Sequence, residues 1–239
     1  MEKKKLLILG GSSDIGIEII KIYLKNNFSV IAQYNKGSKK FFSLVKENKD
    51  FLKQIRFDFS SDNHETEKFF KKKDVLKSDV FINALGSISE MNYENFNLKD
   101  LDKSLKINAY PSIYATSVLG KKMAKKNWGR IVNLGSIGVK FGGGERNFPY
   151  SLSKIILEFF PSHTKKWVKQ NVLINTIRVG VTSTKLHKKL PKKNLKKRAE
   201  LIPMKRMAKP EEIAKFIFFI GSDKNTYISH QVIPISGGE

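Results

Sequence analysis

The fold is decided by the stretch Lys5-Leu6-Leu7-Ile8-Leu9, which runs directly into Gly10-Gly11-Ser12-Ser13-Asp14-Ile15-Gly16. The first part is a short apolar run that ends at two glycines, as a buried strand does before a tight turn. After the turn, apolar side chains recur at Ile19, Ile20 and Leu24, with the spacing of one helix face. The stretch therefore predicts a strand, a tight turn and a helix.

The same alternation of apolar runs and helical patterns continues along all 239 residues. After the first unit, the expected strands are Phe28–Tyr34, Ile55–Phe59, Val80–Ala84, Arg130–Leu134, Leu173–Val179 and Gln231–Ile235. The expected helices are Lys39–Lys49, Glu65–Lys73, Leu98–Lys125, Tyr150–Lys169 and Glu211–Ile220. Strands that alternate with helices form a parallel sheet that is covered on both faces. We therefore expect an α/β fold: a single domain over residues 1–239 with a doubly wound parallel sheet of about seven strands.

One segment breaks the alternation, between the strand that ends near Val179 and the helix that begins after Pro210. Its residues from Lys185 to Arg206 are long for a connection and strongly basic. Long connections in compact domains are commonly lids or binding loops. We expect a basic substrate lid around residues 185–206, which would favour anionic compounds and make rates fall with ionic strength.

The composition excludes several classes of protein. The absence of cysteine rules out a disulfide scaffold and a thiolate nucleophile, and with four scattered histidines we expect no metal site. No apolar run is long enough for a signal peptide or a membrane span, so we expect a cytoplasmic protein with no membrane partner. The 45 Lys and Arg residues exceed the 22 Asp and Glu residues, which gives a formal net charge of +23. Because arginine is scarce and no recognition module is visible, we expect a lysine-rich composition bias rather than nucleic-acid binding.

The glycine-rich turn stands where a phosphate-binding turn must stand, after a strand and at the start of a helix. Glycines allow the backbone to approach a pyrophosphate, and a helix N-terminus offers free N–H groups and partial positive charge. A site for NAD usually carries a carboxylate about 20 residues further on, whereas this chain has Gln33-Tyr34-Asn35-Lys36. Because Lys36 would attract a 2′-phosphate, we expect NADP(H) rather than NAD(H); the alternative is that Lys36 is simply a solvated lysine.

A phenol and an ammonium group stand four residues apart at Tyr150 and Lys154, near the start of a predicted helix and therefore on one face of it. A nearby cation favours the phenolate and lowers the tyrosine pKa, so such a pair can act as general acid or base. Ser136 follows the preceding predicted strand and would lie at the carboxyl edge of the sheet, where ligands bind in doubly wound folds. Its hydroxyl can hydrogen-bond a substrate carbonyl oxygen.

Taken together, these motifs resemble the short-chain dehydrogenase/reductase family, and the resemblance covers essentially the whole chain. Stretches similar to the landmarks of the family occur in the same order. They are Gly10–Gly16, Asp58, Asn83-Ala84-Leu85-Gly86, Asn108, Ser136, Tyr150 with Lys154, Ile202–Arg206 with Pro210–Ala214, and Gly237-Gly238. Coincidence at all of these positions is improbable, because independent matches must multiply.

The resemblance implies a catalytic tetrad of Asn108, Ser136, Tyr150 and Lys154. It implies that Tyr150 exchanges the proton, while Lys154 holds the nicotinamide ribose and lowers the Tyr150 pKa. It also implies that Ser136 orients the carbonyl and that Asn108 supports a water-linked proton relay. The residues implied for cofactor binding are Gly10, Ser12, Ser13, Asp14, Ile15, Gly16, Asn35, Lys36, Asp58, Phe59, Asn83, Ala84, Gly86, Tyr150, Lys154, Thr182 and Thr184.

The chain departs from the family pattern at a few positions. Asp14 stands where the family has a glycine, and a carboxylate near a pyrophosphate is unfavourable. Because Asp14 begins the first helix, we expect its carboxylate to cap that helix. Val179-Gly180 replaces a Pro-Gly pair of the family, with Thr182 and Thr184 still available for the carboxamide and the phosphates.

The family resemblance favours an NADP(H)-dependent carbonyl reductase, most similar to the 3-oxoacyl-[acyl-carrier-protein] reductase branch. A basic surface near Lys125, Lys126, Lys165, Lys166 and Lys169 would suit an acidic carrier protein. A sugar, nucleotide-sugar or polyol substrate is an open alternative, and so is a non-catalytic NADP-binding regulator. The resemblance also implies a homotetramer or homodimer, with the helices Leu98–Lys125 and Tyr150–Lys169 as contact faces.

Overall fold

The computed structural model describes residues 3–185 and 194–239, and these residues build one sheet of seven strands. All neighbouring strands are parallel, in the order β3-β2-β1-β4-β5-β6-β7. The strands are β1 (Lys5–Leu9), β2 (Ser29–Tyr34), β3 (Leu52–Arg56), β4 (Val80–Asn83), β5 (Gly129–Ser136), β6 (Val172–Val179) and β7 (Gln231–Ile235). The doubly wound α/β fold is therefore confirmed, and the strand order reverses between β1 and β4.

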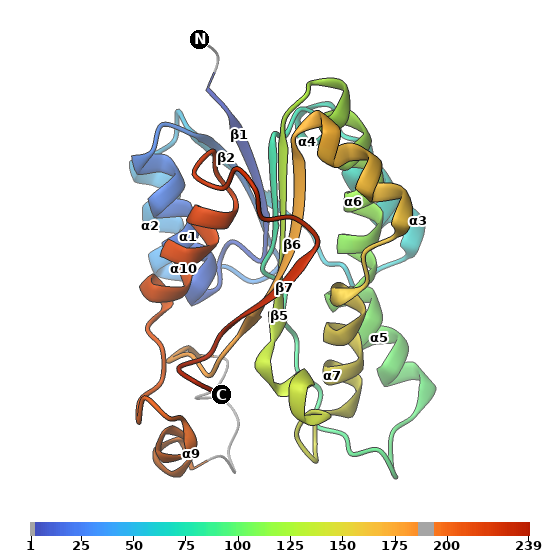
Figure 1. Ribbon diagram of the computed structural model, residues 1–239, viewed down its shortest axis with the longest axis vertical. Coiled ribbons are helices and arrows are strands. Elements are labelled where there is room, and N and C mark those ends of the chain that lie inside the picture. The colour runs from blue at the N-terminus through green and yellow to red at the C-terminus, as the bar shows by residue number, and fades with distance from the viewer. Residues whose placement is uncertain (1–2, 186–193) are drawn as a thin grey trace.

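Helices cover both faces of the sheet (Figure 1). On the left in that view lie α1 (Asp14–Lys25), α2 (Lys39–Glu47) and α10 (Pro210–Ile220). On the right lie α3 (Asn63–Lys71), α5 (Leu98–Asn108), α6 (Tyr110–Lys125) and α7 (Phe148–Ile155). The shorter helices are α4 (Lys73–Leu76), α9 (Leu195–Leu201), η1 (Ile137–Phe141), η2 (Ile156–Glu158) and η3 (Ser162–Gln170). Among the described residues, no helix is both long enough and apolar enough to cross a membrane.

The strand β1 shows why its sequence is apolar without interruption. Leu6 and Ile8 belong to the core cluster that α1 and α10 share with the sheet, whereas Leu7 and Leu9 belong to the cluster on the side of α3 and α6. All four side chains are fully buried. Successive side chains of a strand point to opposite faces, so a strand that is covered on both faces has no solvent side.

The predicted third strand, Ile55–Phe59, is placed too late in the chain. In the structure β3 covers Leu52–Arg56, with Leu52 opposite Val30 of β2. Phe57 and Phe59 follow the strand and pack on Phe69 of α3, with ring centroids 5.0 and 5.4 Å away. The aromatic residues that suggested a strand therefore belong to a loop that packs against a helix.

The predicted helix Leu98–Lys125 is two helices. The first, α5, ends at Asn108, and α6 begins at Tyr110 with Pro111 in its first turn. Proline has no N–H to continue the hydrogen bonds of a preceding helix, but it is well tolerated in the first turn of a new one.

The predicted helix Tyr150–Lys169 is also wrong as a single element. The α-helix α7 ends at Ile155, a single 3₁₀ turn follows, and Phe159 adopts an extended conformation with ψ 120°. Pro161 then precedes η3, which is a 3₁₀ helix. A proline at this position would clash with the carbonyl four residues earlier in a continuous helix, so the chain is broken before it.

The predicted lid is only partly described. Residues 186–193 lie outside the described residues, and the remainder of the 185–206 segment contains the short helix α9. Beyond it, Ala208 forms a parallel bridge with Thr182, which returns the chain to the carboxyl edge of the sheet.

Candidate active site

The site lies at the carboxyl ends of β1 and β4, the two strands between which the strand order reverses. Ligands bind at such a point because the loops after the two strands diverge and leave a crevice. A cavity of about 600 Å³ opens there. The predicted cofactor residues that line it are Gly10, Ser12, Ser13, Asp14, Ile15, Asn35, Lys36, Asp58, Phe59, Ala84, Gly86 and Thr184.

A second cavity of about 310 Å³ shares its wall with the first at Ile15, Leu85 and Leu134. Three of the four predicted catalytic residues, Ser136, Tyr150 and Lys154, line this second cavity, and so does Thr182. Gly16, Asn83 and Asn108 line neither cavity.

The glycine turn is shaped by contacts that exclude larger residues. Gly10 has φ +71°, and a Cβ atom there would lie 2.6 Å from the carbonyl oxygen of Ala84. A Cβ atom on Gly16 would lie 2.4 Å from the carbonyl oxygen of Gly10. The start of α1 is thus held against the ends of β1 and β4, which leaves its first N–H groups at the crevice for an anion.

Asp14 does not cap α1, contrary to the expectation from the sequence. The cap is Ser13, whose Oγ accepts a hydrogen bond from the Gly16 N–H at 3.0 Å. Asp14 is the first helical residue, and its Oδ2 accepts a hydrogen bond of 2.7 Å from the backbone N–H of Lys185. The carboxylate therefore connects α1 to the chain that follows β6.

The end of the first cavity near β2 carries the predicted cation. The hydroxyl of Ser12 donates to the carbonyl oxygen of Lys36 at 2.8 Å, which ties that loop to the glycine turn. Gln33 of β2 also lines this cavity. It is almost fully buried and was not predicted as a site residue. Its Oε1 accepts from the Gly10 N–H at 2.9 Å, and its Nε2 donates to the Phe57 carbonyl at 2.6 Å. An amide is required there because it must accept on one side and donate on the other.

Asp58 lines the same cavity. Burial by itself would raise the pKa of its carboxyl, but hydrogen bonds from the backbone N–H and the hydroxyl of Ser60, at 2.9 and 2.8 Å, and a further one from Asn35 outweigh it. The pKa of Asp58 is therefore lowered, and the carboxylate is ionised at neutral pH.

The second cavity brings together predicted catalytic residues that come from different elements of the chain. Ser136 is the last residue of β5, and its hydroxyl lies close enough to the phenol of Tyr150 in α7 to lower the pKa of that phenol. One turn further along α7, the Lys154 Nζ donates hydrogen bonds of 2.7 Å to the carbonyl oxygens of Leu85 and Leu134. Nζ lies 5.7 Å from the centre of the Tyr150 ring. A phenol, a hydroxyl and an amine thus surround one small volume.

The ionisation of this pair differs from the sequence expectation. Burial lowers the pKa of Lys154 to about 7, because the ammonium is desolvated and has only carbonyl oxygens as partners. Burial raises the pKa of Tyr150, and the hydrogen bond from Ser136 offsets only part of that rise. The pKa of Tyr150 is therefore raised, and the phenol keeps its proton at neutral pH.

Asn108, at the end of α5, is fully buried behind the site. Its Oδ1 accepts from the Ser87 N–H at 2.9 Å, and its Nδ2 donates to the Ser87 carbonyl at 3.0 Å and to the Ser153 Oγ at 2.9 Å. Its own carbonyl oxygen is 3.5 Å from the Asn83 Nδ2. Asn108 therefore joins the loop after β4 to the helix that carries Tyr150 and Lys154.

The fold and the site together define an oxidoreductase that interconverts a carbonyl and an alcohol: the chain belongs to the short-chain dehydrogenase/reductase family. A family model described as enoyl-(acyl carrier protein) reductase matches residues 10–239. The chain is 30% identical to the 3-oxoacyl-[acyl-carrier-protein] reductase FabG of Buchnera aphidicola subsp. Schizaphis graminum, over 100% of this chain and 98% of the relative.

One further relative agrees with this assignment, and a solved structure shares the fold. FabG of Thermotoga maritima is 29% identical, over 100% of this chain and 98% of the relative. A solved structure described as ElxO with NADP bound has a TM-score of 0.85 at 22% identity, and the match covers 99% of this chain and 98% of that one. This likeness supports the fold.

Sequence reasoning missed three features of the site. Gln33 looked like an ordinary strand residue, and the carbonyl oxygens of Leu85 and Leu134 carry no sequence signal because every residue has one. Arg198 of α9 lines the second cavity, yet it stood among many lysines in the basic segment. The signal that could have identified Arg198 is that it is an arginine, because six of the 45 basic residues are arginines and the others are lysines.

Proposed function

We propose that this protein is an NADP(H)-dependent carbonyl reductase whose acid is Tyr150. The observation that carries the proposal is the meeting of Tyr150, Ser136 and Lys154 in a cavity of about 310 Å³ that adjoins the phosphate-binding crevice. Residues that line both cavities, among them Ile15, Leu85 and Leu134, would hold the nicotinamide, which would supply hydride chemistry to a carbonyl carbon. Side chains of this protein supply the proton and orient the substrate.

Tyr150 donates its proton to the substrate oxygen as that oxygen gains negative charge. Its raised pKa suits this role, because the phenol is protonated before the reaction. Ser136, which lines the same cavity as Tyr150, orients the same oxygen. Lys154 binds the nicotinamide ribose, and Asn108 positions α7 through its bond to Ser153. One proton from solvent then restores Tyr150, which balances the proton consumed in the reduction.

The cofactor is NADP(H), and the residues of the first cavity fit it. Gly10 lines the first cavity, and Gly16 lets the start of α1 pack closely against the turn, so that the free N–H groups of the helix face a pyrophosphate. Lys36 and Asn35 stand at the end of β2 where an NAD site places an acid. A cation there favours the 2′-phosphate by direct charge attraction.

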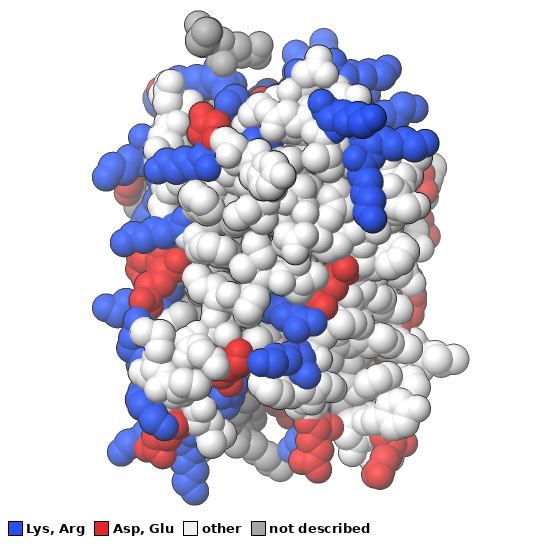
Figure 2. Space-filling model, viewed as in Figure 1, with Lys and Arg blue, Asp and Glu red and all other residues white. Residues whose placement is uncertain are grey.

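For the substrate, we favour a 3-oxoacyl thioester on an acidic carrier protein. Its support is the name of the two FabG relatives, 3-oxoacyl-[acyl-carrier-protein] reductase, and the charge of the surface. Basic side chains gather at the upper right of the face in Figure 2, over η3, in which Lys165, Lys166 and Lys169 are exposed. Of the other predicted lysines, Lys125 is exposed and Lys126 pairs with Asp79 at 2.7 Å. A sugar, nucleotide-sugar or polyol substrate is the alternative.

We further propose that the enzyme is a cytoplasmic homodimer or homotetramer that associates through α6 and the segment after α7. Its support is the exposure of large apolar side chains there: Ile113 is 52% exposed and Phe159 is 76% exposed. Burying such side chains against a second copy is favourable. Light scattering on the purified protein is expected to give at least twice the mass of one chain, and a monomer would contradict the proposal.

The reaction is tested by following NADPH consumption over a panel of carbonyl compounds. The panel holds 3-oxoacyl thioesters, keto-sugars, simple ketones and an enoyl thioester, the last because the family model is described as an enoyl reductase. Tyr150→Phe is expected to lower the rate by about 10²- to 10⁴-fold, as loss of a general acid does. NADPH binding is expected to persist.

Tyr227→Phe is the matched control, because Tyr227 is 96% exposed and lies outside both cavities. Equal rates in Tyr150→Phe and the native protein would refute Tyr150 as the acid. NADPH binding without consumption on any member of the panel would instead favour a non-catalytic regulator.

A further inference from the structure

The substrate cavity holds one charged side chain that the proposed chemistry does not use. Among the described residues that line the cavity, the ionisable ones are Tyr150, Lys154 and Arg198, and none is an aspartate or a glutamate. Tyr150 and Lys154 act on the proton and the cofactor ribose. Arg198 therefore gives the cavity a positive charge that hydride transfer to a neutral ketone does not need.

Arg198 is held in place by a partner from the far end of the chain. Its Nη2 forms an ion pair with the Glu239 Oε1. The Arg198 side chain is 23% exposed and that of Glu239 is 8% exposed. The ion pair therefore connects α9, whose Arg198 lines the substrate cavity, to the segment that follows β7.

The ion pair leaves hydrogen-bonding capacity unused on both partners. A guanidinium has five N–H donors in a fork that fits a carboxylate or a phosphate with two parallel bonds. Among the described residues, the Arg198 fork makes a single such bond, to one oxygen of Glu239. The other oxygen, Oε2, is buried with no hydrogen-bond partner in the described part of the chain. By contrast, Arg206 and Glu212 form two bonds, at 2.7 and 2.8 Å.

We propose that Arg198 selects substrates that carry an anionic group, a carboxylate or a phosphate, at a distance from the reacting carbonyl. This inference rests on the proposed carbonyl reductase function and names its substrate class. The free donors of the guanidinium bind the anion, and Glu239 positions the guanidinium. Arg198 lines the second cavity and not the crevice of the adenosine and pyrophosphate, so the group that it recognises belongs to the substrate.

Two kinds of substrate present an anion that the Arg198 guanidinium would bind in the same way. In one the anion is the carboxylate of a free oxo acid, and in the other it is the phosphate of a phosphopantetheine arm that carries an oxoacyl thioester. Both present oxygen acceptors that a guanidinium binds in a bidentate manner. Matched substrate pairs that differ only in the anion distinguish these two kinds.

The experiment measures kcat and KM for NADPH-dependent reduction of two kinds of substrate pair. The first kind is a series of oxo acids with two to five bonds between the carbonyl and the carboxylate, each beside its methyl ester. The second kind is acetoacetyl-phosphopantetheine beside acetoacetyl-pantetheine. In one of the two kinds, we expect the native protein to prefer the anionic member by about 10- to 100-fold in kcat/KM, the loss that follows removal of a charged hydrogen bond.

Arg198→Gln is expected to abolish that preference by raising KM for the anionic member, because the bond is made equally in ground and transition states. Glu239→Gln keeps an oxygen acceptor that positions the guanidinium but removes the carboxylate charge that neutralises it, and it is expected to lower KM for the anionic member. Arg206→Gln is the matched control, since its ion pair with Glu212 lies outside the substrate cavity. NADPH affinity, measured by fluorescence titration, is expected to be the same in Arg198→Gln and the native protein.

The possible failures are distinguishable. Equal kcat/KM for the anionic and neutral members in the native protein overturns this inference and leaves the reductase standing, and this result depends on no variant. Weaker NADPH binding in Arg198→Gln with an unchanged substrate KM also overturns it, because Arg198 would then serve the cofactor. No reduction of any member, with NADPH still bound, overturns the proposed function itself.

Discussion

At the scale of single residues, Lys154 shows how burial alters a side chain that the motif identifies. Its Nζ has two carbonyl oxygens as partners, and burial lowers its pKa to about 7. A lysine with a lowered pKa is charged below that value and neutral above it. The free protein therefore carries this positive charge only in the lower part of the physiological pH range.

We expect NADPH to bind less tightly as the pH rises through about 7, because the free protein then loses a charge beside an anionic cofactor. The cofactor phosphates stabilise the charged lysine and raise its pKa in the complex. The affinity for NADPH therefore continues to fall with rising pH until the pH reaches the pKa of Lys154 in the complex. The dissociation constant is measured by fluorescence titration between pH 6 and about 9. Lys154→Met is expected to remove this dependence, and a native profile identical to that of the variant would count against it.

At the scale of elements, the turn between β1 and α1 shows how closely three segments must approach. Gly10 is in the left-handed region, and the nearest atom to a Cβ there would be a backbone oxygen of Ala84, which cannot rotate away. The turn therefore requires glycine for two independent reasons, its backbone conformation and its lack of a side chain.

Gly10→Ala is expected to lower the free energy of unfolding by about 1–3 kcal/mol, the usual cost of a strained backbone conformation. In a domain of this size, that corresponds to a fall of roughly 2–4 °C in Tm per kcal/mol. Thermal unfolding followed by circular dichroism measures it. Gly86→Ala is the control for stability, because a Cβ at Gly86 would meet nothing within 4 Å. If both variants had the same Tm as the native protein, the steric argument would be wrong.

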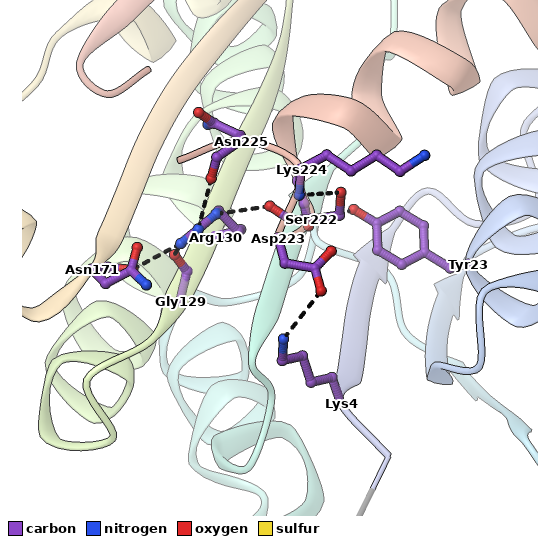
Figure 3. Close-up of polar contacts among 10 residues, drawn as sticks. Lys4, Tyr23, Gly129, Arg130, Asn171, Ser222, Asp223, Lys224 and Asn225 are labelled. Atoms are coloured by element: carbon purple, nitrogen blue, oxygen red, sulfur yellow. Dashed lines mark hydrogen bonds and ion pairs between the residues drawn. The ribbon is translucent and has the colours of Figure 1, made fainter. Parts of the chain in front are cut away.

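At the scale of the whole molecule, Arg130 connects segments that are far apart in the chain (Figure 3). Its fully buried guanidinium donates to the carbonyl oxygens of Gly129, Asn171, Ser222 and Asn225, at 2.8 to 3.0 Å. Burial lowers its pKa to about 10, so it stays charged at neutral pH. The strand β5, the turn before β6 and the turn after α10 are thus held by one side chain.

Arg130→Met is expected to lower the free energy of unfolding by about 3–5 kcal/mol, because it leaves several buried carbonyl oxygens without a donor. Urea unfolding provides the measurement. Arg146→Met is the matched control, since Arg146 is exposed and lies 3.9 Å from Glu90, and surface ion pairs of this kind contribute about 0–1 kcal/mol. Equal destabilisation by the two substitutions would show that the buried hydrogen bonds of Arg130 contribute nothing to the free energy of unfolding.

Much of the fold could be predicted because its signals are local. The bounds of β1 and β7 agree with the predicted Lys5–Leu9 and Gln231–Ile235, since strands in a parallel sheet are short apolar runs between turns. The errors arose where a tertiary contact or a proline decides the structure. Phe57 and Phe59 look like strand residues until α3 packs on them, and Pro161 breaks a pattern that is helical in its apolar spacing.

The sequence by itself determined the strand-turn-helix start, the parallel sheet and the motif residues from Gly10 to Lys154, because these follow from patterns within a few residues. Only the tertiary structure decided the ionisation of Tyr150 and Lys154, which depends on burial. It also decided the pairing of Arg198 with Glu239. Desolvation and contacts between distant segments exist only once the chain has folded, and no local pattern encodes them.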